Sequence, residues 1–364
     1  MKPIIQIEPW IDKSELKQLK KVVKSTFVSE HKLNKEFESL IKEITASPHA
    51  VSMTNGTAAL FCALKAVGIG EGDEVIVPNM TFIASANAVI FAGATPVLCD
   101  VDETSMCMAA ENVEKVITSR TKAIMPVHLY GRSCDMDSLI KVAKQFNLKI
   151  IEDAAQGMGV LYKDQHVGTF GDAGILSFYA NKTITCGEGG VVLSGNPNII
   201  QDCYKMKNHG RKEKGVFVHE SIGFNFCFTE MQAAIGISQL KKLKKVIKRK
   251  GEIYDFYQNN INNNALEFIP IDKRTTPVHW FTSFFTDHKE ALKEYLKSHK
   301  IQTRDFFYPL HLQPCYQTSD LINVDMQLPV SERIFQRGIS LPSAYNITTR
   351  QLKYICKTIN NFRA

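Results

Sequence analysis

The feature that most constrains the fold is a long alternation of short apolar runs and amphipathic stretches, which continues to about residue 250. Several runs are apolar at consecutive positions, as strands are when both faces of their sheet are covered. Segments with helical spacing of apolar residues separate them, for example 57–68 and 135–147. We therefore predict an α/β fold with a largely parallel sheet covered by helices. The strand candidates are EVIVP (74–78), ATPVLCDVD (94–102), KAIMPVHLY (122–130), KIIEDAA (149–155), GILSFY (174–179) and GGVVLS (189–194).

The two ends of this region differ from its centre. Residues 13–45 have a helical pattern with a lysine-rich polar face, and a helix is predicted around 231–249. That helix ends in the basic run KKLKKVIKRK, but apolar residues recur within the run at helical spacing. We interpret it as the solvated face of an amphipathic helix and not as a nucleic-acid patch. Aromatic-rich strands and short helices follow, so residues 1–250 are predicted to form a large domain and 251–364 a smaller one.

Composition and charge exclude several classes of protein. Hydrophobic residues make up 44% of the 364 residues and charged residues 22%, as in ordinary globular chains. The net charge of +7 is spread too thinly to indicate a nucleic-acid partner. No stretch approaches the roughly 18 apolar residues of a membrane span, and the N-terminus has no apolar signal region. The nine cysteines lack CxxC or disulfide-like spacing, so we expect a cytoplasmic protein with reduced thiols and no metal.

A polar turn before an apolar helix is the first candidate for ligand binding. Thr54, Asn55, Gly56 and Thr57 lead directly into the helical pattern of AALFCAL. The first turn of a helix has free N–H groups and a positive dipole end, which favour a bound phosphate. An ordinary helix cap is the alternative, and it is the better interpretation of this turn taken alone.

A carboxylate at the end of an apolar run is the second candidate. Asp153 follows the strand candidate KIIE, and in open α/β sheets ligands bind at the carboxyl ends of strands. A carboxylate that faces a pyridine nitrogen keeps that nitrogen protonated. A helix cap or a structural ion pair is the alternative interpretation.

A lysine between two strand candidates is the third. Lys182 lies in the segment Ser177 to Lys182, and a glycine-rich turn follows it. Partial burial there would lower the pKa of its amine and make the amine nucleophilic towards an aldehyde. A phosphate anchor, a strand-end carboxylate and a reactive amine together are the three groups that pyridoxal 5′-phosphate requires.

These residues lie in segments that resemble the DegT/DnrJ/EryC1/StrS sugar-nucleotide aminotransferases, which are fold-type I pyridoxal-phosphate enzymes. The similarity covers nearly the whole chain. It implies a large domain with a mostly parallel mixed sheet and a smaller C-terminal α+β domain. The matching segments are TNGTAAL, VPNMTFIASANAV, GATPVLCDVD, PVHLYG, IIEDAAQ, FGDAGILSFYANKTITCGEGG, GFNFCFTEMQAAIGISQL and TRDFFYPLHLQPCY.

The resemblance also implies a role for individual residues. Lys182 would form the Schiff base, and Asp153 would pair with the ring nitrogen. The other cofactor contacts would be Gly56, Thr57 and Ser177 at the phosphate, Phe82 over the ring, Gln156 at the ring substituents, and Asn225 at the phosphate of a neighbouring subunit. The last of these implies a homodimer with shared active sites.

Two further residues are candidates for substrate binding, and one position departs from the family pattern. Arg304 and His311 are the substrate-side candidates, because a guanidinium suits a diphosphate and an imidazole suits a sugar hydroxyl. A structural role for each is the alternative. The family commonly has GYNYRM where this chain has GFNFCF, so Cys227 replaces the usual arginine. The dehydratase branch has histidine in place of the lysine, so Lys182 favours transamination.

The expected reaction transfers the amino group of L-glutamate to a nucleotide-linked keto sugar and releases 2-oxoglutarate, with the cofactor passing through its pyridoxamine 5′-phosphate form. Three segments, 178–190, 301–316 and 339–343, are most similar to the branch that aminates C4 of GDP-4-keto-6-deoxy-D-mannose to give GDP-perosamine. UDP- or dTDP-linked keto sugars aminated at C4 or C3, a related dehydratase or epimerase, and a pyridoxal-phosphate-binding regulatory protein are the alternatives.

Overall fold

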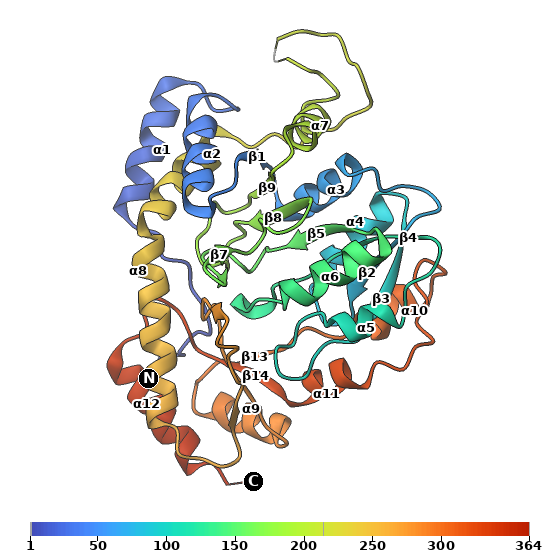
Figure 1. Ribbon diagram of the computed structural model, residues 1–364. Helices are drawn as coiled ribbons and strands as arrows, with labels where there is room; N and C mark the ends of the chain where they lie inside the picture. The colour runs from blue at the N-terminus through green and yellow to red at the C-terminus, as the bar shows by residue number, and fades with distance from the viewer. Residues whose placement is uncertain (1, 214, 364) are drawn as a thin grey trace.

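The computed structural model describes residues 2–213 and 215–363, and a seven-stranded sheet lies at the centre of these residues (Figure 1). Its strand order is β1-β9-β8-β5-β4-β2-β3. The five strands from β8 to β3 run parallel, and β9 is antiparallel to both of its neighbours. The strands are β1 His49–Met53, β2 Glu74–Pro78, β3 Thr95–Cys99, β4 Thr121–Ile124, β5 Lys149–Asp153, β8 Ala173–Ser177 and β9 Gly190–Ser194. The predicted α/β fold and mostly parallel mixed sheet are confirmed.

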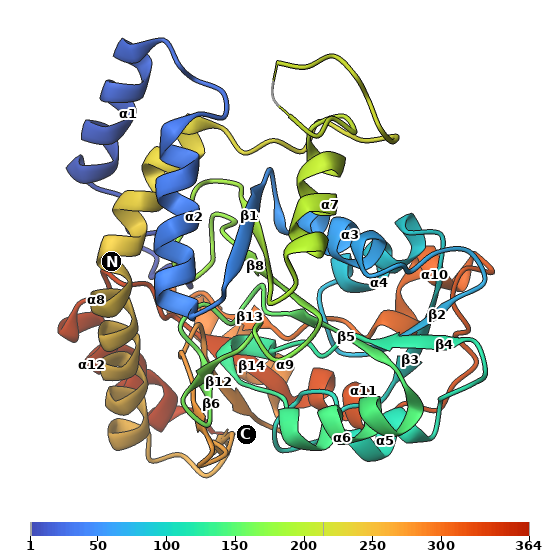
Figure 2. The ribbon, with the colours of Figure 1, turned by 45° about the horizontal axis from the view of Figure 1, so that its top comes forward.

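Helices cover both faces of this sheet, with α3, α4 and α7 on one side and α5 and α6 on the other (Figure 2). The sequence of the strand β2 is continuously apolar because both faces of the strand are covered. Val75 and Val77 pack with α3 and α4, whereas Ile76 between them packs with α6 on the opposite face. The covering helices are α3 Gly56–Ala66, α4 Ala84–Phe91, α5 Ala110–Glu114, α6 Met136–Phe146 and α7 Pro197–Lys207.

The N-terminal helical pattern forms two helices, α1 Lys13–Ser25 and α2 Lys32–Thr45. The first ends at Thr26, which adopts a left-handed conformation with φ of 64°. The carboxylate of Glu230 caps the N-terminus of the second helix. It accepts hydrogen bonds from backbone N–H groups that include those of His31 and Asn34, at 2.9 and 3.0 Å. A negative charge at a helix N-terminus satisfies free N–H groups and interacts favourably with the helix dipole.

The C-terminal part contains a four-stranded antiparallel sheet of order β10-β12-β14-β13. A hairpin, β6 Leu161–Tyr162 and β7 Gln165–His166, pairs with β11 Thr275–Thr276 to form a third, small sheet. The strands of the four-stranded sheet are β10 Glu267–Phe268, β12 Thr282–Phe285, β13 Arg304–Asp305 and β14 Gly338–Leu341. The helices here are α9 Lys289–Ser298, α10 Pro314–Gln317, α11 Pro329–Arg337 and α12 Thr349–Asn361, and the short 3-10 turns are η1 Leu129–Gly131 and η2 Leu310–Leu312.

A single long helix, α8 Glu230–Asn260, connects the two main sheets. It packs on α1 and α2 near its start and on α12 near its end (Figures 1 and 2). The domain boundary predicted between residues 250 and 251 therefore falls within this helix, and the division into two domains stays a prediction. Among the described residues, no helix combines the length and the apolar character that crossing a bilayer requires.

Candidate active site

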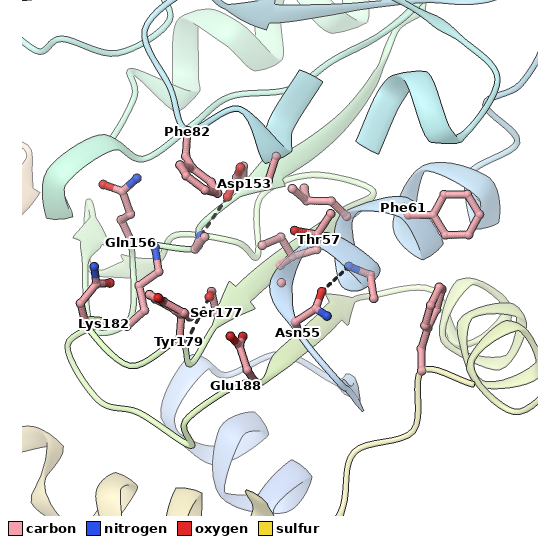
Figure 3. Close-up of a pocket in the computed structure, with 18 of the residues that line it drawn as sticks. Asn55, Thr57, Phe61, Phe82, Asp153, Gln156, Ser177, Tyr179, Lys182 and Glu188 are labelled. Carbon is pink, nitrogen blue, oxygen red and sulfur yellow. Dashed lines mark hydrogen bonds between the residues drawn. The ribbon is translucent and has the colours of Figure 1, made fainter. Parts of the chain in front are cut away.

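A cavity of about 1040 Å³ lies at the carboxyl ends of β5 and β8, beside the first turn of α3. It brings together most of the predicted site residues. Figure 3 shows Thr57, Asp153, Ser177 and Lys182 turned towards a shared space. The predicted residues that line the cavity are Gly56, Thr57, Phe82, Asp153, Gln156, Ser177, Lys182 and Arg304.

The first turn of α3 forms one end of the cavity. The side chain of Asn55 caps this helix by accepting a hydrogen bond from the N–H of Ala58 at 2.9 Å. A Cβ atom on Gly56 would lie 3.1 Å from the Cβ of Ser177, so glycine allows the helix to begin directly against the end of β8. The N–H groups of the first turn and the hydroxyls of Thr57 and Ser177 are thereby gathered as donors suited to a phosphate.

Asp153, at the end of β5, is buried and is held by two donors. Its Oδ2 accepts a hydrogen bond from the Ser85 hydroxyl at 2.7 Å, and its Oδ1 accepts one from the Ala155 N–H at 3.1 Å. Ser85 is in turn within 2.9 Å of the Thr81 hydroxyl. These bonds fix the orientation of the carboxylate in the cavity wall. Ser85 was not predicted from the sequence, although a serine in the mostly apolar helix α4 is a polar residue in need of a partner.

Lys182 lies in the loop that follows β8. Burial lowers the pKa of its amine to about 8, because the charged form loses contact with water. The carboxylate of Asp153 acts in the opposite direction, and the guanidinium of Arg304 lowers the pKa further. A larger fraction of this amine is therefore neutral and nucleophilic near neutral pH than of an exposed lysine.

The side chain of Gln156 is oriented by the backbone of Tyr130, which has an unusual conformation. Its Oε1 accepts a hydrogen bond from the N–H of Tyr130 at 2.8 Å, and Tyr130 has a φ of 53° that is rare for a bulky residue. This bond turns the amide oxygen towards the Tyr130 backbone, and Gln156 lines the cavity. Tyr130 also accepts a hydrogen bond on its hydroxyl from the N–H of Phe307 at 2.8 Å, and the two rings are stacked. Phe82 lies beside Phe307 with 54% of its surface exposed.

The two substrate-side candidates have different environments. Arg304, on β13, lines the cavity, with its guanidinium carbon 5.2 Å from the ring centre of Phe281. His311, in η2, is buried outside the cavity lining. Its Nδ1 lies 2.9 Å from the Asn79 side-chain nitrogen, and its Nε2 lies 3.2 Å from the Glu332 carboxylate. The structure therefore does not bring His311 together with the other predicted site residues.

Asn225 also lies outside the cavity of its own chain. It is exposed and pairs through its backbone with Asn208, while its neighbours Phe224 and Phe226 line the cavity. Cys227, at the position of the family's arginine, donates a hydrogen bond from its thiol to the carbonyl of Lys207 at 3.4 Å. Burial raises the pKa of this thiol.

Several lining residues were not predicted from the sequence. They come from α3, from the loop that contains the lysine, from the region before β12 and from the loop after β13. They include Phe61, Tyr179, Asn181, Glu188, Trp280 and Phe307. Burial raises the pKa of the Glu188 carboxyl, which faces the cavity (Figure 3). Within the described residues, no group of three or more histidine, cysteine or acidic side chains is arranged to hold a metal ion.

The residues that are present fit pyridoxal phosphate. An amine with a lowered pKa, an oriented carboxylate and a helix start placed against a serine are gathered around one cavity. The glycine at position 56 keeps the phosphate end open, because a side chain there would occupy the space next to Ser177. This donor set suits an anionic pyridine aldehyde and offers no cluster of metal ligands.

Comparison with known proteins gives the same assignment. The model of the DegT/DnrJ/EryC1/StrS aminotransferase family matches residues 9–360. The chain belongs to this family. It is 39% identical to the GDP-perosamine synthase of Escherichia coli O157:H7, over the whole of this chain and 99% of that one. It is 37% identical to the GDP-perosamine synthase of Vibrio cholerae, over 98% of each chain.

Solved structures of family members have the same fold. S. venezuelae DesV, solved with a reaction intermediate, is 30% identical, with a TM-score of 0.93 over 99% of this chain and 98% of that one. The putative sugar aminotransferase Spr1654 of Streptococcus pneumoniae, in its PLP form, is 25% identical, with a TM-score of 0.91 over 98% of both chains. The predicted family, fold class and enzyme class are thereby confirmed, and the chain is a sugar aminotransferase.

Proposed function

We propose that this aminotransferase uses pyridoxal phosphate to transfer the amino group of L-glutamate to C4 of a nucleotide-linked 4-keto-6-deoxy sugar. The proposed substrate is GDP-4-keto-6-deoxy-D-mannose, and the product is GDP-perosamine. The similarity to GDP-perosamine synthases over the full chain supports the substrate. The observation that carries the chemistry is the gathering of Lys182, Asp153 and the start of α3 around one cavity.

Each of these groups has a proposed role. When bound, the cofactor supplies an electron sink for the carbon that exchanges the amine. Gly56, Thr57 and Ser177 bind the phosphate, and Asp153 holds a proton at the pyridine nitrogen. The amine of Lys182 anchors the cofactor and moves the proton at the reacting carbon, for which a pKa of about 8 suits both acceptance and donation near neutral pH.

The substrate side of the cavity is assigned to Arg304. Its guanidinium lines the same cavity as Lys182, and a planar guanidinium suits the diphosphate of a sugar nucleotide. The proposed contact of His311 with a sugar hydroxyl has less support, because both ring nitrogens lie within hydrogen-bonding distance of protein side chains.

Product analysis tests the proposed function. The purified enzyme, loaded with pyridoxal phosphate, is given L-glutamate and either a GDP-, a UDP- or a dTDP-linked keto sugar, and the products are identified by mass spectrometry. We expect nitrogen to enter only the GDP-linked sugar at appreciable rate, with one 2-oxoglutarate formed for each amino sugar. A preference for a UDP- or dTDP-linked sugar would overturn the nucleotide assignment, and loss of oxygen without gain of nitrogen would indicate a dehydratase.

We also infer that the protein is a homodimer that acts in the cytoplasm. The segment before Asn225 presents apolar side chains to solvent, including Phe217 at 81% and Ile222 at 90% exposure. Exposed apolar patches of this kind mark interaction surfaces. The segment lies in the arm between α7 and α8 that extends from the body (Figure 1). All nine cysteines are free thiols, which fits a reducing compartment.

Mixed dimers test whether Asn225 reaches the partner's cofactor. Lys182→Ala and Asn225→Ala subunits are each defective, but a hybrid dimer would contain one site with an intact lysine and an intact asparagine. We expect mixing and re-pairing to raise activity above that of either variant, towards at most half of the wild-type activity per dimer. Subunit exchange is verified with two affinity tags. If Asn225 serves its own subunit's site, every site keeps one lesion and mixing restores nothing.

A further inference from the structure

A buried tryptophan contacts the candidate catalytic lysine and the carbonyl of the residue before it. Trp280 precedes β12 and is 1% exposed. Its indole N–H donates a hydrogen bond to the carbonyl of Asn181 at 2.6 Å, and the Lys182 amine lies 4.7 Å from the centre of its ring. The tryptophan therefore contacts both the backbone from which the lysine side chain starts and the amine at which it ends.

Trp280 is itself held by groups from other elements. Its carbonyl accepts a hydrogen bond from the amine of Lys250, on α8, at 2.8 Å, and the same amine donates to the Ser343 carbonyl at 2.9 Å. The indole ring stacks on Phe281 with 4.0 Å between ring centres. The loop of Lys182 is thus connected through one side chain to α8 and to the segment that follows β14.

The backbone position of Lys182 has to be fixed because the side chain that extends from it is long and flexible. Four methylene groups give the amine many rotamers, and a displacement of about 1 Å from the reacting atom can lower a rate by about a hundredfold. The loop after β8 has no strand partner at Asn181 or Lys182. The N–H of the peptide between them donates to the Tyr179 carbonyl at 2.9 Å, but this bond lies within the loop and does not attach the loop to another element. The hydrogen bond from the indole attaches this peptide to the segment before β12, and the ring covers one side of the amine.

We infer that Trp280 is a positioning residue that fixes the Lys182 loop through the Asn181 carbonyl and keeps the amine in a water-poor position. This inference rests on the proposed role of Lys182 in the reaction. It assigns a function to a side chain that lies 99 residues from Asn181 in the sequence.

The first experiment removes the indole N–H and keeps an aromatic ring. In the cofactor-free Trp280→Phe protein, the pH dependence of Lys182 acylation by acetic anhydride is measured by peptide mass spectrometry. We expect the midpoint to move upward from about 8 towards the ordinary lysine value of 10.5, because a loosened loop admits water to the amine. We expect kcat of the loaded enzyme to fall by about tenfold to a hundredfold. An unchanged or lower midpoint in a folded variant overturns the inference.

Trp10→Phe is the matched control. Trp10 also lies 4.7 Å from a lysine amine, that of Lys242, but it stacks on Tyr345 and does not line the cavity. This variant should keep the Lys182 midpoint at its wild-type value. A shift of similar size in both variants would show a general effect of losing an indole and would overturn the inference.

A second measurement keeps Trp280 intact and does not depend on the folding of its variant. The chain has two tryptophans, so the ¹⁵N-indole spectrum of the Trp10→Phe protein contains only the Trp280 signal. We expect this signal to exchange slowly with solvent and to titrate with the Lys182 midpoint, and the titration should disappear in the Trp10→Phe, Lys182→Ala double variant. A rapidly exchanging signal without this titration overturns the inference.

Failure of the inference and failure of the proposed function can be distinguished. Borohydride reduction of the loaded wild-type enzyme, followed by peptide mapping, identifies the lysine that carries the cofactor. A tag on another lysine overturns both. A tag on Lys182 together with an unchanged midpoint in Trp280→Phe leaves the proposed function in place and overturns only the role of Trp280.

Discussion

Lys182→Ala is expected to abolish transamination and to leave the fold intact. Among the described residues that line the cavity, Lys182 is the only lysine, so no other amine is in place to anchor the cofactor or to move the proton. Loss of a group that acts both as nucleophile and as acid or base should lower turnover by at least about a thousandfold. The rate of 2-oxoglutarate formation from L-glutamate measures this loss.

The fold of this variant is checked by circular dichroism and thermal unfolding. Truncation removes a partly desolvated amine, but it breaks no hydrogen bond to a buried carbonyl. The midpoint temperature of thermal unfolding should therefore change little. Lys163→Ala is the control, because Lys163 is an exposed lysine that pairs with Asp137 on the surface. That variant should keep wild-type turnover. Substantial turnover by Lys182→Ala would contradict the assignment of the lysine.

Asp153→Asn is expected to lower the rate by about a hundredfold to ten-thousandfold while the shape of the site is kept. The amide has nearly the same volume as the carboxylate and its oxygen still accepts a hydrogen bond, but it carries no charge to hold a proton on a pyridine nitrogen. The rates of both half-reactions and the absorption spectrum of the bound cofactor are the measurements. Both should change in this variant.

Ser85→Ala is the matched comparison for the carboxylate. It removes the 2.7 Å hydrogen bond to Asp153 and keeps the negative charge. We expect a much smaller loss of rate than in Asp153→Asn, because the charge and not its orientation alone maintains the ring proton. Near-normal activity of Asp153→Asn would mean that the carboxylate is structural and serves only to cap the turn at Ala155.

The sequence predicted those elements whose residues carry a local signal. All six strand candidates overlap observed strands, because burial on both faces leaves a continuous apolar run. The strand β1 was missed, since HAVSM is short and contains polar residues. The break between α1 and α2 was also missed. It depends on the left-handed residue Thr26 and on Glu230, which is distant in the sequence.

In the candidate site, too, only the residues that carry a local sequence signal were predictable. Asp153 and Lys182 follow apolar strands and belong to recognisable motifs, and both line the cavity. Trp280 and Tyr130 could not be found in this way, because their roles depend on contacts between distant segments. Tyr130, for example, contacts Phe307 across 177 residues. The buried setting of His311 depends similarly on Asn79, which no spacing rule connects to it.

The helix α8 limits how this enzyme can be rebuilt from parts of its relatives. Its 31 residues extend about 46 Å. Lys242, near the middle of the helix, binds Glu15, and Arg249, further along, binds the carbonyls of Tyr345 and Ile347. A chimera that joins the N-terminal part of one family member to the C-terminal part of another therefore has to exchange this helix together with its partners near both chain termini. We therefore expect single substitutions of cavity residues to change substrate preference more readily than exchange of an N-terminal or C-terminal half.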